Sequence, residues 1–269
     1  MIGINHLGKM KERLANQMFQ YAALKGIAKN RGFQYCVPPS SYKDQGDQWD
    51  QHQLFNTFEL GSLNPLQVQY LDQDRCRFIS PKFFHFDEDL FNGCPDNVSL
   101  LGFFQSEKYF KNVREELLTD FTFKYNLKED CEEFIKDHDR PIALHIRRTD
   151  YANYQHHPIQ SLTYYAEALD CFDDDRTVFV FSDDPDWCMK QKLFDEERFY
   201  ISQNDHLTDL CMMTLCSDFI IANSSFSWWG AWLSTNEDKR VVAPKKWFGP
   251  PLSEQNDTKD LYCDGWIVI

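Results

Sequence analysis

Short apolar runs and stretches of helical spacing alternate along the second half of the chain. Runs rich in β-branched and aromatic residues predict strands at 141–146, 177–181, 219–222 and 240–243. Apolar residues three and four positions apart predict helices between them, at 162–169 with Ser161 as the N-cap, at 207–215 and at 228–233. Because strands that alternate with helices form parallel sheets, this half is predicted to be a small Rossmann-type domain.

The first half has a less regular pattern. Its clearest element is a predicted helix over 14–30, with an apolar face made of Met18, Tyr21, Ala22 and Ile27.

Two polar stretches interrupt the chain. Residues 37–64 are rich in Gln, Asp, Ser and Pro, which predicts a long irregular connection. Residues 127–140 are highly charged and predict an exposed helix followed by a linker. We therefore expect two domains, at 1–136 and at 137–269.

Composition is typical of a folded protein without an affinity for polyanions. The 269 residues are 42% hydrophobic and 16% aromatic, enough for a substantial core. The formal net charge of -14 argues against binding nucleic acid or an anionic membrane through bulk charge. A phosphate ligand would therefore need a local cluster of cations.

The nine cysteines are scattered and form no Cys-x-x-Cys motif, which favours reduced thiols in a cytosolic protein over a zinc site. The N-terminus lacks the pattern of a signal peptide, and no apolar run is long enough to span a membrane.

Polar side chains follow three of the predicted strands. In open α/β sheets ligands bind at the carboxyl ends of the strands, so these side chains are candidates for one site. They are His145, Arg147, Arg148 and Asp150 at the end of the first strand, Ser182, Asp183 and Asp184 at the end of the second, and Asn223, Ser224 and Ser225, followed by the apolar Phe226, at the end of the third.

Arg147 and Arg148 carry planar guanidinium groups that match phosphate oxygens. Adjacent residues of a strand point to opposite faces, so one arginine is expected to face the ligand and the other to brace the fold. Ser224, Ser225 and Ser227 precede a predicted helix, where hydroxyls and free N–H groups either cap the helix or hold a diphosphate. Trp228 and Trp229 are interpreted as core residues rather than as a stacking platform.

Asp184 and Asp186 form an Asp-x-Asp motif, which in some sugar transferases holds a divalent metal. Because the chain has 42 acidic residues, such motifs also arise by chance, and we expect no metal site.

Six segments, spread over nearly the whole chain, carry a resemblance to a known family. They are Leu-Ala-Asn-Gln-Met-Phe-Gln-Tyr-Ala at 14–22, Leu-Gly-Phe-Phe-Gln-Ser-Glu-Lys-Tyr-Phe at 101–110, His-Ile-Arg-Arg-Thr-Asp-Tyr at 145–151, Val-Phe-Val-Phe-Ser-Asp-Asp at 178–184, Ile-Ile-Ala-Asn-Ser-Ser-Phe-Ser-Trp-Trp at 220–229 and Pro-Lys-Lys-Trp at 244–247. In this order they resemble glycosyltransferase family 11, the α-1,2-fucosyltransferases.

The resemblance implies an α/β fold of the two-domain GT-B type. Its two Rossmann-type halves would be an acceptor-side domain at 1–136 and a domain at 137–269 whose parallel sheet binds the nucleotide sugar. It also implies inverting transfer of L-fucose from GDP-fucose to the 2-hydroxyl of a galactoside, without a metal or other cofactor. The expected partners are GDP-fucose and a galactose-terminated glycan. The expected compartment is the cytoplasm. For an acceptor that is made at a membrane, the protein is expected to lie at the periphery of that membrane.

Residue roles follow by the same resemblance. Arg147 would hold the β-phosphate, His145 and Asp209 would contact guanine or its ribose, and Asp183 would organise the strand-end loops. The remaining donor-side candidates are Arg148, Ser182, Asn223, Ser224, Ser225 and Phe226. Asp150 would act as the catalytic base or orient an arginine, and both roles stay open. Asn16 and Gln17 would belong to the acceptor side or to a loop, and Lys245, Lys246 and Trp247 are further neighbours.

One segment departs from the family pattern. The family usually has Gly-Gly-Leu-Gly-Asn-Gln after its first strand, whereas this chain has Glu-Arg-Leu-Ala-Asn-Gln at 12–17. Arg13 and Ala15 adopt positive φ less readily than glycine, so either the loop is rebuilt from Gly8 onward or ligand binding is altered. Two alternatives therefore accompany the main hypothesis: a non-catalytic sugar-nucleotide binder, and a metal-dependent transferase that uses Asp184 and Asp186.

Overall fold

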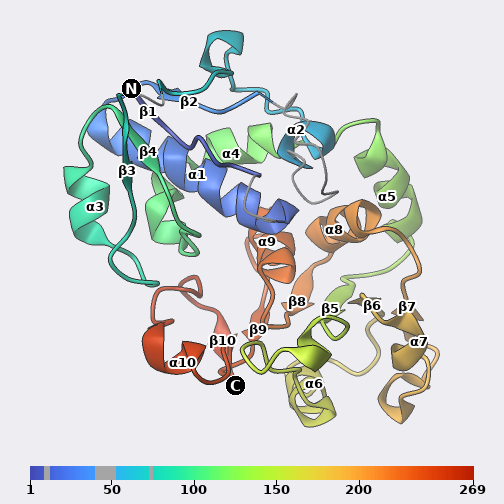
Figure 1. The fold of residues 1–269 in the computed structure, drawn as a ribbon. Coiled ribbons are helices and arrows are strands. Elements are labelled where there is room, and N and C mark those ends of the chain that lie inside the picture. The colour runs from blue at the N-terminus through green and yellow to red at the C-terminus, as the bar shows by residue number, and fades with distance from the viewer. Residues whose placement is uncertain (9–12, 40–52, 73–74) are drawn as a thin grey trace. The chain divides into compact units, whose positions relative to one another are not determined.

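The computed structural model describes residues 1–8, 13–39, 53–72 and 75–269. The chain forms two compact units (Figure 1). Unit 1 comprises residues 1–124 and 256–263, and unit 2 comprises residues 125–255 and 264–269.

Unit 1 is built on a parallel four-stranded sheet in the order β2-β1-β4-β3. Its strands are β1 (Ile2–Gly3), β2 (Tyr35–Cys36), β3 (Arg77–Ile79) and β4 (Val98–Leu100). Its α-helices are α1 (Leu14–Arg31), α2 (Gln53–Thr57), α3 (Glu88–Gly93) and α4 (Arg114–Asp120), with 3-10 turns at Pro65–Gln67, Glu107–Tyr109 and Lys111–Val113.

Helix α1 confirms the helix predicted at 14–30, but it is buried on nearly every side rather than along one apolar face. Gly26 shows how closely its neighbours approach, because a Cβ there would lie 1.9 Å from the carbonyl oxygen of Tyr109. Lys25 is also buried, and its Nζ contacts Asp120 Oδ2 at 2.5 Å. Tyr21 donates a hydrogen bond of 2.8 Å to the same oxygen, so this buried charge is paired and hydrogen-bonded.

Unit 2 is built on a parallel six-stranded sheet in the order β10-β9-β8-β5-β6-β7. Its strands are β5 (Ile142–Ile146), β6 (Val178–Ser182), β7 (Phe199–Ile201), β8 (Asp218–Ile220), β9 (Val241–Ala243) and β10 (Ile267–Val268). Its helices are α5 (Leu127–Ile135), α6 (Leu162–Leu169), α7 (Pro185–Cys188), α8 (His206–Leu215), α9 (Ser225–Leu233) and α10 (Leu252–Gln255), with 3-10 turns at Tyr151–Asn153 and Lys192–Phe194.

The strand order of unit 2 is that of the Rossmann fold. The first three strands run outward from β5 on one side, and the chain then returns to place β8 against the other side of β5. Ligands of such sheets bind where the order reverses, outside the carboxyl ends of the strands. The ends of β5 and β8 are therefore the expected position of a ligand in this unit.

Alternation along β5 directs its side chains to two layers. Ile142, Leu144 and Ile146 join a core with Tyr165 and Leu169 of α6. His145 points to the opposite face, where its ring lies 5.5 Å from that of Phe226 on α9. Figure 1 shows α6 and α7 on one side of this sheet and α8 and α9 on the other.

The observed units differ from the expected domains in two places. Helix α5, expected in the first domain, belongs to unit 2 because Cys131 and Ile135 are buried and its Phe134 ring packs on Phe179 of β6. Residues 256–263, expected in the second domain, return to unit 1, where Lys108 and the backbone of Phe86 bind Asp260.

The irregular connection expected at 37–64 contains a helix, α2, because Leu54 and Thr57 find buried positions. Residues 40–52 of that connection lie outside the described part of the chain.

Candidate functional site: the strand ends of unit 2

Arg147 lies directly beyond the end of β5, between two carboxylates. Its guanidinium forms ion pairs of 2.8 Å with Asp150 Oδ1 and 3.2 Å with Asp183 Oδ2. Its side chain is 17% exposed, so it is fixed in place but still reaches solvent. The guanidinium also lies 5.6 Å from the ring centre of Tyr151.

Asp183 joins the ends of β5 and β6. Its Oδ1 accepts a hydrogen bond of 2.8 Å from the backbone N–H of Arg148, and its Oδ2 accepts one of 3.1 Å from that of Thr149. The Thr149 hydroxyl donates to the same oxygen. Asp183 thus holds the loop after β5 against β6.

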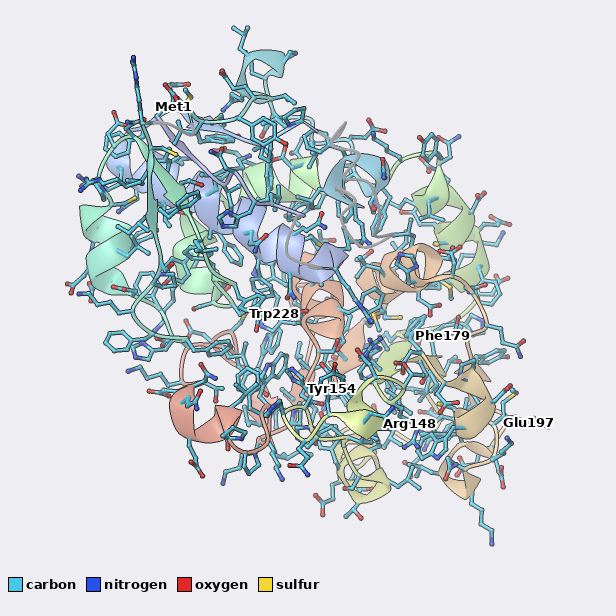
Figure 2. The ribbon with its side chains drawn as sticks, viewed as in Figure 1. Met1, Arg148, Tyr154, Phe179, Glu197 and Trp228 are labelled. Atoms are coloured by element: carbon cyan, nitrogen blue, oxygen red, sulfur yellow. The ribbon has the colours of Figure 1, made fainter. Side chains whose placement is uncertain are left out.

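Arg148, labelled in Figure 2, has partners other than those of Arg147. Its guanidinium lies 3.8 Å from the ring centre of Trp187 in α7, and its Nε is 3.5 Å from Asp184 Oδ2. This arrangement braces the loop after β5 against α7. That only one of the two arginines faces a ligand stays a prediction. Asp184 is also the N-cap of α7, because it accepts a hydrogen bond from the Trp187 N–H, and Ser182 Oγ in turn accepts from the Asp184 N–H.

The segment between β8 and α9 supplies backbone N–H groups at the neighbouring strand end. Ser224 is the N-cap of α9 and accepts a bond of 3.4 Å from the Phe226 N–H. Ser225 begins the helix, and Ser227 donates its hydroxyl to the Ser224 carbonyl. Ser224 therefore acts as a cap, while the helix start keeps the positive end of its dipole at this edge.

Asn223 holds this segment in place rather than pointing only to a ligand. Its amide group donates to the carbonyl oxygens of Pro158, at 3.0 Å, and of Trp247, at 2.9 Å. Tyr151 donates its hydroxyl to the Asn223 carbonyl at 3.0 Å, which ties the loop after β5 to the end of β8. Sequence reasoning named no role for Tyr151, although it belongs to the motif that contains Arg147.

Two buried polar atoms stand out at this edge. Within the described part of the protein, His145 Nδ1 and Asn223 Oδ1 are buried without a hydrogen-bond partner. Burial lowers the pKa of His145 to about 3, with Arg147 adding to the effect and Asp183 opposing it, so the imidazole is neutral at physiological pH. A buried polar atom of this kind calls for a partner from a ligand or water.

Asp209, in the first turn of α8, is buried and accepts a bond of 2.5 Å from the Ser202 hydroxyl. Burial raises the pKa of its carboxyl to about 7; the hydrogen bond from Ser202 opposes the rise, and the charge of Asp205 adds to it.

The other predicted residues lie elsewhere. Gln17 is fully buried in α1 and accepts a bond of 3.4 Å from the Leu54 N–H, so it braces α2 rather than facing a ligand. Asn16 accepts a bond of 3.0 Å from Gln105. Both belong to unit 1, whereas the residues named above belong to unit 2.

The segment that lacks the family glycines begins α1 without positive φ. Arg13, the N-cap, has φ of -75°, and Ala15 is the second residue of the helix. Gly8 has φ of 77°. The rest of the loop that the sequence suggested is rebuilt, residues 9–12, lies outside the described part.

Trp228 and Trp229 are fully buried, which confirms that they are core residues. Where the chain is described, no three His, Cys, Asp or Glu side chains gather as metal ligands would. In the same residues no helix is long and apolar enough to cross a membrane.

Comparison with known proteins assigns the chain to a family. The sequence profile of glycosyl transferase family 11 matches residues 4–269. The chain belongs to this family. It is an enzyme of the glycosyltransferase class, which leaves the non-catalytic alternative without support.

Among curated relatives, an α-1,2-colitosyltransferase of Escherichia coli is 31% identical over 95% of this chain and 96% of its own length. A bovine galactoside 2-α-L-fucosyltransferase is 25% identical over 83% of this chain, which spans only 63% of that relative. The solved structure of the fucosyltransferase NodZ from Bradyrhizobium shares the fold, with a TM-score of 0.53, 13% identity and coverage of 86% and 92% of the two chains. The GT-B-like fold expected from the sequence is thus confirmed.

Proposed function

We propose that this glycosyltransferase moves L-fucose from GDP-fucose to the 2-hydroxyl of a galactoside, with inversion and without a metal ion. The observation that carries the proposal is the position of Arg147. It lies at the end of β5, paired with Asp150 and Asp183, at the point where the strand order reverses, and the neighbouring strand β8 leads into α9.

The charge that develops during transfer explains this arrangement. The acceptor oxygen attacks the anomeric carbon, the bond between that carbon and the phosphate oxygen breaks, and its electron pair remains on the departing GDP. Arg147 and the N–H groups at the start of α9 would stabilise this negative charge. Since both are held by fixed hydrogen bonds and ion pairs, little reorganisation is needed as the charge appears.

The acceptor hydroxyl must lose its proton in the same step. Asp150 is our candidate for the base, directly or through a water, although its ion pair with Arg147 equally suits the orienting role. His145 and Asp209 would contact the guanosine part of the donor. Their buried polar atoms, one of them without a protein partner, support this assignment.

A second donor deserves a place in the experiment because of the colitosyltransferase that matches 95% of this chain. Colitose is L-fucose without its 3-hydroxyl. A site that hydrogen-bonds this hydroxyl rejects the deoxy sugar strongly, whereas an apolar site does not.

The test is a donor screen with GDP-fucose, GDP-colitose, GDP-mannose and UDP-galactose against lactose, with the linkage of any product determined. We expect fucosylation at the 2-hydroxyl of galactose, unchanged by EDTA. Preferred use of GDP-colitose would favour the second donor. Loss of activity in EDTA would overturn the metal-free mechanism, and binding of GDP without turnover of any donor would overturn the proposal as a whole.

A further inference from the structure

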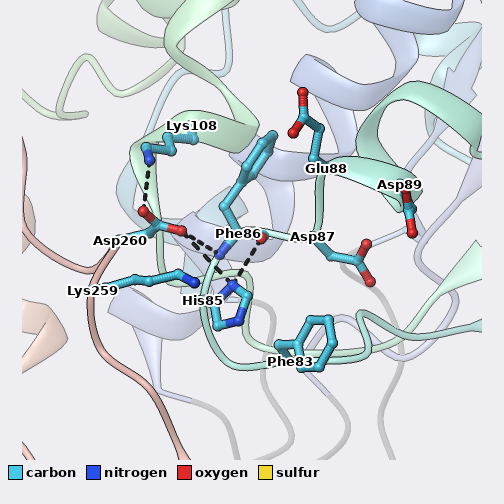
Figure 3. Close-up of a pocket in the computed structure, with 9 residues that line it drawn as sticks. All are labelled: Phe83, His85, Phe86, Asp87, Glu88, Asp89, Lys108, Lys259 and Asp260. Carbon is cyan, nitrogen blue, oxygen red and sulfur yellow. Dashed lines mark hydrogen bonds and ion pairs between the residues drawn. The ribbon is translucent and has the colours of Figure 1, made fainter.

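Unit 1 contains a cavity of about 400 Å³ with no assigned role (Figure 3). It is lined by residues of the loop before α3 and of the first turn of α3, by Lys108, and by Lys259 and Asp260 of the returning segment 256–263. All of these belong to unit 1, and none is a candidate for donor binding. Its volume falls within the range of roughly 300–1,000 Å³ that is typical of small-molecule sites.

Phe83 offers this cavity a flat apolar surface. Its ring stacks on the His85 ring with centroids 4.7 Å apart and an interplanar angle of 9°. The Phe83 side chain is nevertheless 54% exposed. The His85 ring thus covers one face of the Phe83 ring. A ligand that covered the exposed part of the ring would remove apolar surface from water.

The polar part of the lining is held in place by Asp260. Its Oδ1 accepts a bond of 2.6 Å from Lys108, and its Oδ2 accepts one of 3.2 Å from the Phe86 N–H and lies 3.8 Å from His85 Nδ1. Because the Phe86 carbonyl oxygen can only accept, the 3.0 Å contact with His85 makes Nδ1 the protonated nitrogen. In the neutral ring Nε2 is then an acceptor.

The charges of the lining restrict the ligand. Both lysines of the lining already have carboxylate partners: Lys108 pairs with Asp260 at 2.6 Å and Lys259 with Asp257 at 3.5 Å. Asp89 in turn pairs with Lys82 at 3.0 Å. Because the two lysines are engaged and carboxylates surround them, the lining disfavours phosphates and acidic sugars. Hydrogen-bond donors and acceptors occur together, which suits hydroxyl groups because a hydroxyl both donates and accepts.

We propose that this cavity binds an uncharged saccharide, with the C–H face of the sugar ring on Phe83 and its hydroxyls facing Asp260, Glu88 and Lys259. The assignment of that saccharide to the acceptor glycan rests on the proposed function. The cavity would then recognise the acceptor independently of the nucleotide sugar.

Calorimetric titration of the full chain with lactose, in the absence of any nucleotide, tests this proposal. We expect Phe83→Ala to weaken lactose binding roughly tenfold, and Phe83→Trp to preserve it. Phe78→Ala is the matched control, because Phe78 is also exposed, at 57%, and its ring also lies beside a histidine. The centroids of the Phe78 and His6 rings are 5.6 Å apart. It should bind lactose as the unchanged protein does, and 3′-sialyllactose, which carries a carboxylate, should bind more weakly than lactose.

Equal affinities of the Phe83→Ala and Phe78→Ala variants would overturn the proposal, as would tighter binding of sialyllactose. Arg147→Ala separates this inference from the proposed function. If the donor site is wrongly assigned, fucosyl transfer will not respond to that change, yet nucleotide-free lactose binding will still depend on Phe83.

Discussion

At the scale of single residues, the Arg147 guanidinium lies between Asp150 and Asp183, and both ion pairs are closed at 3.2 Å or less. Two carboxylates paired with one guanidinium restrict the orientations that it can adopt. The neighbouring Arg148 has the same charge but stacks on Trp187, so the two residues should respond differently to substitution.

Arg147→Ala should reduce kcat/KM by at least about a hundredfold, because it removes a fixed cation from the developing charge on GDP, worth on the order of 3 kcal/mol. Steady-state kinetics with GDP-fucose measures this, with circular dichroism to verify folding. Arg147→Lys should recover only part of the activity, since an ammonium lacks the planar fork. Activity of Arg147→Ala within about tenfold of the unchanged enzyme would contradict the assigned role.

Asp209 predicts a pH dependence of stability. Its pKa of about 7 exceeds the unfolded value of roughly 4, so between these values the folded protein holds more protons than the unfolded one. The free energy of unfolding should therefore fall as the pH rises from about 4 to about 7, and this contribution should be constant above that. In the unchanged protein this fall should amount to at most a few kcal/mol. Denaturant titrations of Asp209→Asn across this pH range should not show it.

Asp205 provides a control of opposite sign. Burial opposes ionisation of its carboxyl, but hydrogen bonds from the Thr208 and Leu207 N–H groups outweigh it and lower the pKa. Its contribution is present above the unfolded pKa and is lost as the pH falls, so Asp205→Asn should weaken stability at neutral pH. Equal slopes for the Asp209→Asn variant and the unchanged protein would show that Asp209 ionises normally.

At the scale of elements, α1 carries two lysines in contrasting environments four residues apart. Lys25 is 2% exposed and contacts Asp120, which is fully buried. Lys29 is 54% exposed and pairs with Glu116 at 2.6 Å. Buried and exposed ion pairs thus occur on one helix, which allows a direct comparison of their energies.

Lys25→Met should destabilise the protein by about 3–5 kcal/mol, because it leaves the Asp120 carboxylate buried without its cation. Lys29→Met should cost less than about 1 kcal/mol, since its charge is solvated. Urea denaturation of both variants measures the difference. Equal losses would indicate that burial of the Lys25–Asp120 pair has no energetic consequence.

At the scale of the whole molecule, the residues proposed for the donor site all belong to unit 2 and the proposed saccharide cavity belongs to unit 1. A ligand that binds only the folded protein stabilises it by mass action. The two ligands should therefore protect different parts of the chain.

GDP at about a hundred times its Kd should raise the unfolding free energy by about 2.7 kcal/mol. Hydrogen exchange should slow at residues 145–151, 182–184 and 223–227, the loops that we propose hold the diphosphate. Residues 83–89 should respond to lactose and not to GDP. Protection by GDP confined to unit 1 would contradict the donor site.

The sequence by itself determined most of unit 2. The predicted strands at 141–146, 177–181, 219–222 and 240–243 correspond to β5, β6, β8 and β9, because buried parallel strands are continuous apolar runs. Ser161 caps α6 as expected. Short strands such as β7 and β10, and the two-residue strands of unit 1, have no such signal. They exist because neighbouring strands supply their hydrogen bonds.

Motifs and strand ends also placed Arg147, Asp183 and Ser224 at one edge, since the carboxyl ends of parallel strands converge. Only the tertiary structure decided which contacts each of these side chains makes. Three features depend on partners distant in sequence. They are the stacking of Arg148 on Trp187, the burial of Gln17, and the return of residues 256–263 to bind Lys108. A local pattern specifies which face of an element is apolar, but long-range packing determines what that face meets.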